Sequence, residues 1–105
     1  MRIAPMAPRL HLFVCANRRT DSSLGGGCAE AGDAVYDALK EDVATRARLA
    51  DIWITKTHCL GLCPPRGSTV ASYPLGRVFT EVHATEAASL LARELDGVER
   101  REKKA

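Results

Sequence analysis

Four cysteines constrain this chain more than any other feature of its sequence. They form two pairs: twelve residues separate Cys15 from Cys28, and three residues separate Cys59 from Cys63. Four thiols divided in this way are typical of a disulfide framework, a zinc site, an iron–sulfur site or a thiol redox centre. The spacing and the surrounding residues decide between these kinds of site.

The spacing favours some of these sites over others. Structural zinc usually takes cysteine pairs with about two to four residues between them, which Cys15 and Cys28 fit badly. A dithiol oxidoreductase needs two residues between its cysteines, and no pair in this chain has that spacing. The cysteine runs of plant-type and bacterial ferredoxins do not match either.

Length and composition indicate one ordinary globular domain. The chain has 105 residues, 46% of them apolar and 27% charged, which suffices for a core without disulfides. Residues 1–9 do not resemble a secretory signal, and no apolar stretch is long enough to span a membrane. We therefore expect a cytoplasmic protein without a membrane partner, whose reduced thiols hold a metal rather than form disulfides. The net charge of +2 is too small to indicate a nucleic-acid partner.

The apolar pattern predicts strands and helices in a mixed order. Residues 10–15 read as a strand that is apolar on both faces, which indicates a sheet covered on both sides. One face carries Leu10, Leu12 and Val14, and the other carries Phe13. A first helix is expected from residue 29 to about residue 42, with one buried stripe. Its apolar positions are Ala31, Ala34, Val35, Ala38 and Leu39.

The second half of the chain predicts three more strands and a helix. Strands are expected over residues 51–55, 69–73 and 77–82, the last two joined by a turn at 74–76. A second helix is expected over residues 85–95, and Gly97 is expected to end it. Its apolar face consists of Ala87, Leu90, Leu91 and Leu95. Together these elements indicate an α/β sandwich.

The cysteines lie at the ends of these elements. Cys15 ends the first strand, and Cys28 comes at the start of the first helix, where the helix dipole favours thiolate over thiol. Cys59 and Cys63 follow the second strand in a loop, and two prolines come directly after Cys63. We expect His58 to lie near this site or on the surface rather than to bind metal, because four cysteines already complete a ligand set.

Residues 10–96 resemble the thioredoxin-like 2Fe–2S ferredoxins. The resemblance rests on the strand that leads into Cys15, on Gly27-Cys28-Ala29, on the loop from Cys59 to Cys63 and on the hairpin of residues 70–79. The chain departs from the family at Pro64-Pro65-Arg66, where the family usually has a Gly-Pro pair.

The resemblance implies both a fold and a function. The fold would be a thioredoxin-like sandwich of about four strands in a mixed sheet with two main helices. Outside the range of the resemblance, residues 1–9 read as a flexible arm, and 97–105 read as a charged tail whose alternating signs predict solvated disorder. Cys15, Cys28, Cys59 and Cys63 would hold a 2Fe–2S cluster. The protein would be an electron carrier rather than an enzyme, would meet redox partner proteins, and would form a homodimer.

Two groups of residues bear on these partners. A sheet of four strands with two helices leaves surface to cover, and Trp53 is expected in packing or in an interface. Arg18 and Arg19 lie in the first predicted ligand loop, Arg66 directly follows the second, and Arg77 lies on the hairpin. The first three are either ordinary solvated arginines or a docking rim for an acidic partner surface.

Two other functions remain open on the sequence. One is a structural or regulatory module with zinc on the same four cysteines. The other is an enzyme, either a thiol oxidoreductase or the iron–sulfur subunit of a reductase. The visible spectrum and the metal content of the purified protein distinguish all three.

Overall fold

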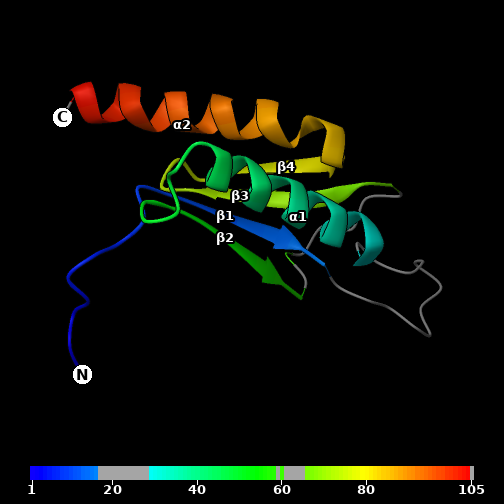
Figure 1. The fold of residues 1–105 in the computed structure, drawn as a ribbon, viewed down its shortest axis with the longest axis horizontal. Coiled ribbons are helices and arrows are strands. Elements are labelled where there is room, and N and C mark those ends of the chain that lie inside the picture. Colours follow the sequence, from blue (N-terminus) through cyan, green and yellow to red (C-terminus); the bar gives the residue numbers. More distant parts are fainter. Residues whose placement is uncertain (17–28, 59, 61–65, 105) are drawn as a thin grey trace.

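The computed structural model of the chain describes residues 1–16, 29–58, 60 and 66–104. Figure 1 shows the order of the elements along the chain. They are β1 (Leu10–Cys15), α1 (Ala29–Thr45), β2 (Ile52–Thr57), β3 (Ser68–Tyr73), β4 (Arg77–Val82), a short 3-10 turn (Ala84–Glu86) and α2 (Ala87–Lys104). β1 and β4 have the predicted bounds, and both helices run further than predicted.

The four strands form one mixed sheet in the order β2-β1-β3-β4. β1 runs parallel to β2, and α1 connects these two strands. β1 runs antiparallel to β3. β3 and β4 form the predicted hairpin. The predicted α/β fold, with a four-stranded mixed sheet and two main helices, is therefore confirmed.

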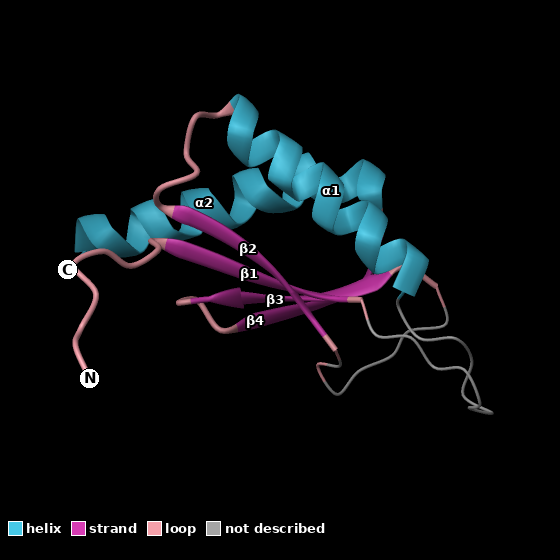
Figure 2. Ribbon diagram, turned by 60° about the horizontal axis from the view of Figure 1, so that its bottom comes forward, coloured by secondary structure: helices cyan, strands magenta, loops and turns pink. Residues whose placement is uncertain are grey.

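Both helices lie on the same side of the sheet (Figure 2). Every second residue of β1 points into the core beneath them, so that Leu10, Leu12 and Val14 are fully buried. α1 contributes Val35, Leu39 and Val43, which a spacing of four residues places along one stripe. Ala34, predicted to belong to this stripe, is exposed instead.

Helix α2 has the predicted apolar face but not the predicted end. Its four expected core residues are all buried. The prediction that Gly97 ends the helix is wrong, because α2 continues to Lys104 and buries Val98 one residue later. The tail through Lys104 is thus helical, whereas we expected disorder.

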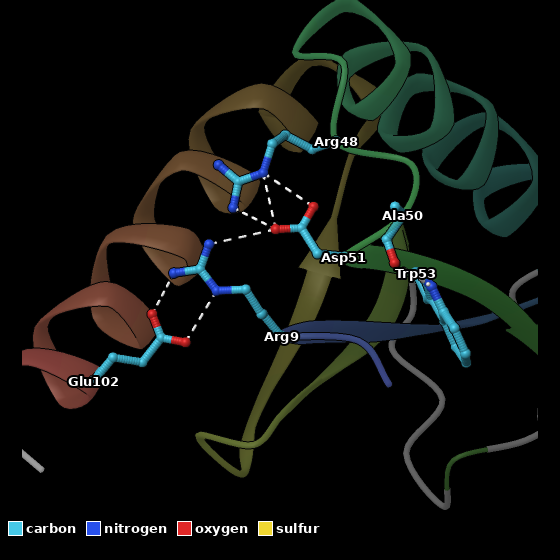
Figure 3. Close-up of polar contacts among 6 residues, drawn as sticks. All are labelled: Arg9, Arg48, Ala50, Asp51, Trp53 and Glu102. Carbon is cyan, nitrogen blue, oxygen red and sulfur yellow. Dashed lines mark hydrogen bonds and ion pairs between the residues drawn. The ribbon is translucent and has the colours of Figure 1, made fainter. Parts of the chain in front are cut away.

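A hydrogen-bonded network ties the ends of the chain together (Figure 3). The Arg9 guanidinium forms an ion pair with Glu102 of α2, and its Nη1 lies 3.4 Å from Asp51 Oδ2. Asp51 also accepts a hydrogen bond of 2.6 Å from Arg48 Nη2. The Arg48 guanidinium, with that of Arg9, holds the pKa of Asp51 below its ordinary value of 3.8. The last residue of the predicted flexible arm is therefore anchored to both the α1–β2 turn and α2.

The sheet face away from the helices carries a cluster of aromatic rings. His11 stacks on Phe13 with ring centroids 4.0 Å apart, and Trp53 and Tyr73 contact this pair edge-on at 5.8 and 6.0 Å. Trp53 and Tyr73 are 37% and 50% exposed, so the rings are only partly covered. Within the described residues no helix covers this face, which corrects the prediction of a sheet covered on both sides. We call it the uncovered sheet face.

None of the helices in the described ranges is long and apolar enough to cross a bilayer.

Candidate metal centre

One end of the sheet gathers the described parts of the predicted site. β1 and β2 are parallel, so their carboxyl ends meet at the same edge, where Cys15 pairs with Thr57. β3 is antiparallel to β1 and therefore begins at that edge with Ser68. The first turn of α1 reaches the same place, because Gly32 lies directly against Cys15.

Cys15 is fully buried at the end of β1, and contacts from two other strands hold it. Its Sγ donates a hydrogen bond of 3.2 Å to the backbone carbonyl of His58, the residue that follows β2. Its own backbone carbonyl accepts a hydrogen bond of 2.8 Å from Ser68 Oγ. The next amide, that of Ala16, donates to the carbonyl of Thr57 at 3.0 Å and so extends the pairing with β2. The thiol is not in a disulfide.

Gly32 explains how α1 comes so close to this cysteine. A Cβ atom at this position would lie 2.1 Å from the Cys15 carbonyl oxygen and 2.8 Å from the Cα of Ala16. Only a residue without a side chain allows the helix and the end of β1 to approach in this way.

A second glycine brings the chain into β3. Gly67 has a φ of +72°, and a Cβ there would lie 2.7 Å from the backbone carbon of Glu81 and 2.8 Å from the carbonyl oxygen of Val82. The left-handed backbone lets the chain turn beneath β4 immediately before Ser68. Arg66, one residue earlier, is exposed.

The structure places only one of the four predicted ligands. Cys15 is buried at the end of β1, whereas Cys28, Cys59 and Cys63 lie outside the described residues. Within the described ranges, no three or more histidine, cysteine or acidic side chains gather as a metal site. A ligand set of four cysteines therefore stays a prediction.

The other residues singled out in the sequence have mixed outcomes. The side chain of His58 is exposed, and it is its backbone carbonyl that contacts Cys15. Arg18 and Arg19 lie outside the described residues. Arg77 lies far from Cys15, at the hairpin turn, where it pairs with the fully buried carboxylate of Glu94 at 2.7 Å.

Sequence reasoning missed two residues of this site. Gly32 gave a weak signal, because a glycine inside an amphipathic helical pattern often marks close packing. Ser68 gave none, since its contact with Cys15 joins residues 53 positions apart.

Comparisons with known proteins give matches in structure. The chain superposes on the crystal structure of the wild-type thioredoxin-like [2Fe-2S] ferredoxin from Aquifex aeolicus with a TM-score of 0.74 and 28% sequence identity. The match covers 87% of this chain and 89% of that one. The chain has the fold of a thioredoxin-like [2Fe-2S] ferredoxin. A cysteine-to-serine variant of the Aquifex aeolicus protein matches with a TM-score of 0.73 and 27% identity, over 84% of this chain and 88% of that chain.

The sequence comparisons give no further relative. No family model matches the chain, and no curated protein matches it. The resemblance to the thioredoxin-like [2Fe-2S] ferredoxins that the cysteine pattern indicated is thus confirmed by the fold.

Proposed function

We propose that this protein carries single electrons through a 2Fe–2S cluster held by Cys15, Cys28, Cys59 and Cys63. The observation that carries the proposal is the position of Cys15. It is a buried thiol outside any disulfide, at the sheet edge where β1 and β2 both end, in the fold of a [2Fe-2S] ferredoxin. The protein acts as an electron carrier rather than an enzyme.

Among the described residues, Cys15 is a suitable ligand for such a cluster. A cysteine thiolate is the usual ligand of iron–sulfur clusters, and the cluster, when bound, supplies one-electron redox chemistry. Cys15 provides one such donor, and its burial excludes water from that side. His58 follows β2 and leads directly to Cys59, and the contact of its carbonyl with Cys15 Sγ brings the start of the second ligand loop to the first ligand. Gly32 brings α1, which follows Cys28, to the same point.

Metal analysis of the freshly and anaerobically purified protein tests this function. We expect iron and acid-labile sulfide in equal amounts, together with the visible absorbance of a 2Fe–2S cluster. Single changes of Cys59 or Cys63 to alanine should remove most of that absorbance. If all four single cysteine variants kept their iron, the ligand assignment would be wrong. One zinc per chain in a colourless protein would support the zinc module instead.

We further propose that two copies pair through the uncovered sheet face. Its rings are in contact with one another yet remain partly exposed, and Val78 beside them is 50% exposed. Covering such apolar surface is favourable, so a second copy would complete the burial that the helices give the opposite face. Burial lowers the pKa of His11 below its ordinary 6.5, so its ring joins this face as a neutral group at pH 7.

Sedimentation of matched variants tests this pairing. Trp53→Glu places a charge on the uncovered sheet face and should yield monomers at tens of micromolar. The control is Leu49→Glu, which changes another exposed apolar residue that lies outside the strands, in the turn between α1 and β2. A wild-type protein that sediments as a monomer would contradict the pairing, as would a Trp53→Glu dimer.

Redox partners would meet the protein near its metal centre. Arg66 is exposed two residues before Ser68, and with Arg18 and Arg19 we propose that it forms a rim for an acidic partner surface. Such charges act mainly on the association rate, and salt screens them. Reversing the three charges to glutamate should slow electron transfer at low ionic strength and have little effect at high salt.

The matched control reverses three charges at the far end of α2. It changes Arg100, Lys103 and Lys104 to glutamate, so the change in net charge is the same. If both triple variants slowed equally, net charge rather than a docking rim would explain the effect. A cytoplasmic location stays a prediction from the sequence.

A further inference from the structure

We propose that Ser68 is a positioning residue for Cys15. Ser68 is fully buried at the first position of β3, and its Oγ donates a hydrogen bond of 2.8 Å to the Cys15 backbone carbonyl. The inference rests on the proposed function only in taking Cys15 as a cluster ligand. The hydrogen bond from Ser68 forms within the protein itself and does not require a bound cluster.

The hydroxyl stands where the backbone pairing between β1 and β3 stops. The register of these strands ends at Val14 opposite Val70, one residue before Cys15. At this point the pairing of β3 with β4 is also irregular, between Ser68 and Val70. A side chain, rather than a backbone amide of β3, therefore satisfies the last carbonyl of β1.

The same carbonyl is closed in from the other side by α1. Gly32 lies so near that even a methyl group would collide with the carbonyl oxygen. A buried carbonyl enclosed in this way has no route to water, and among the described residues the Ser68 hydroxyl donates to it. Without the Ser68 hydroxyl, the Cys15 peptide would lower its free energy by rotating its carbonyl toward another hydrogen-bond donor.

The orientation of this peptide decides where the thiol points. The backbone of Cys15 sets the direction of its Cα–Cβ bond, and Sγ donates a hydrogen bond of 3.2 Å to the His58 carbonyl. Groups that hold a metal ligand through its neighbours commonly fix the geometry of the ligand. Ser68 thus holds Cys15 in place without touching a metal itself.

Ser72 provides a matched control on the same strand. It is also a fully buried serine, and it lies four residues further along β3, which places it on the same face of the strand. Its hydroxyl has no hydrogen-bond partner among the described residues. Ser68→Ala and Ser72→Ala therefore remove the same atom from similar surroundings, and only the first removes a contact with Cys15.

The test is the rate at which iodoacetamide alkylates Cys15 in the metal-free full-length chain, resolved by mass spectrometry, with the other three cysteines as internal references. We expect Cys15 to react about fivefold faster in Ser68→Ala, the factor for losing one neutral hydrogen bond in a local opening. Ser72→Ala should react like the wild type. Equal Cys15 rates in the two variants would overturn the proposal. So would a rate increase shared by all four cysteines, which indicates general loosening.

A second pair of variants covers the case in which Ser68→Ala does not fold. Ser68→Thr and Ser68→Val have nearly the same shape, and only threonine keeps the hydroxyl. Cys15 should react faster in the valine variant, and equal rates would overturn the proposal. In loaded protein, the visible circular dichroism should differ between these two variants. Because the alkylation uses metal-free protein, its result is independent of cluster binding, whose failure would appear as an absence of iron in the wild type.

Discussion

The change Gly32→Ala tests how tightly the first helix is packed against the proposed ligand. The added Cβ would lie 2.1 Å from the Cys15 carbonyl oxygen, while ordinary van der Waals contact begins at 3.4 Å. It would also approach two further backbone atoms of residues 15 and 16, at 2.8 and 2.9 Å. Since none of these atoms belongs to a flexible side chain, the first turn of α1 or the end of β1 must move by about 1 Å.

Two opposing effects set the size of the change in stability. Overpacking a tight core costs about 1–3 kcal/mol, and the rigid backbone contact places this site in the upper part of that range. Alanine is a better helix former than glycine by about 1 kcal/mol, which offsets part of the cost. We expect the free energy of unfolding to fall by about 1–2 kcal/mol. For a domain of this size, the melting temperature would fall by roughly 5–15 °C.

The assay is thermal and urea unfolding of the metal-free protein, with Gly97→Ala as the matched control. Gly97 is also inside a helix, but its added Cβ would meet Leu75 Cδ1 at 2.8 Å and Arg77 Nη2 at 3.1 Å. Both are side-chain atoms. Arg77 Nη2 also holds Glu94, but it needs to yield by only a few tenths of an ångström, so the gain in helix propensity should offset the cost and leave stability close to that of the wild type. A Gly32→Ala protein at least as stable as the wild type would refute the packing argument, and so would equal losses in the two variants.

Two further predictions concern ion pairs away from the candidate metal centre. Arg77→Met leaves the fully buried carboxylate of Glu94 without its hydrogen bonds of 2.7 and 3.2 Å. Because Arg77 itself is half-exposed, the free energy of unfolding in urea should fall by about 3 kcal/mol, the lower end of the range for a broken buried pair. Adding Glu94→Leu should recover much of this loss, and no recovery would contradict the reasoning. Arg48 and Arg9 hold the pKa of Asp51 below 3.8, so this carboxylate stabilises the fold fully above that pH and loses its effect as the pH falls below it. Between about pH 5 and 2, the melting temperature should fall less steeply in Arg9→Gln than in the wild type, and equal slopes would count against this role.

The sheet could be predicted well because its signals are local. The strand bounds follow from runs of apolar residues, and alternation along β1 correctly placed Leu10, Leu12 and Val14 on one face. The prediction that both faces are covered was wrong. Phe13 made the second face look like core, yet within the described chain the uncovered sheet face carries partly exposed rings that contact one another.

The end of α2 shows a local rule that packing overrides. A glycine followed by a charged tail is a usual helix end, but Val98 is buried after Gly97, and Glu94 is held by Arg77 from the hairpin. Contacts between distant segments therefore extend the helix past its local stop. The Arg9–Glu102 pair adds a contact across 93 positions, which no sequence window contains.

In the candidate site, too, some features follow from the local sequence and others only from contacts between distant segments. The position of Cys15 at a strand end follows from the apolar run before it, and the structure confirms it. The fit of Gly32 against its carbonyl and the hydrogen bond from Ser68 depend on how three elements meet, so they emerge only from the folded chain.

Iron and sulfide analysis of the anaerobically purified wild-type protein tests the central claim most directly. We expect about two irons and two sulfides per chain, a reddish-brown colour, and loss of both colour and iron when Cys15 is changed to alanine. A colourless protein would contradict the account, whether it held one zinc or no metal at all.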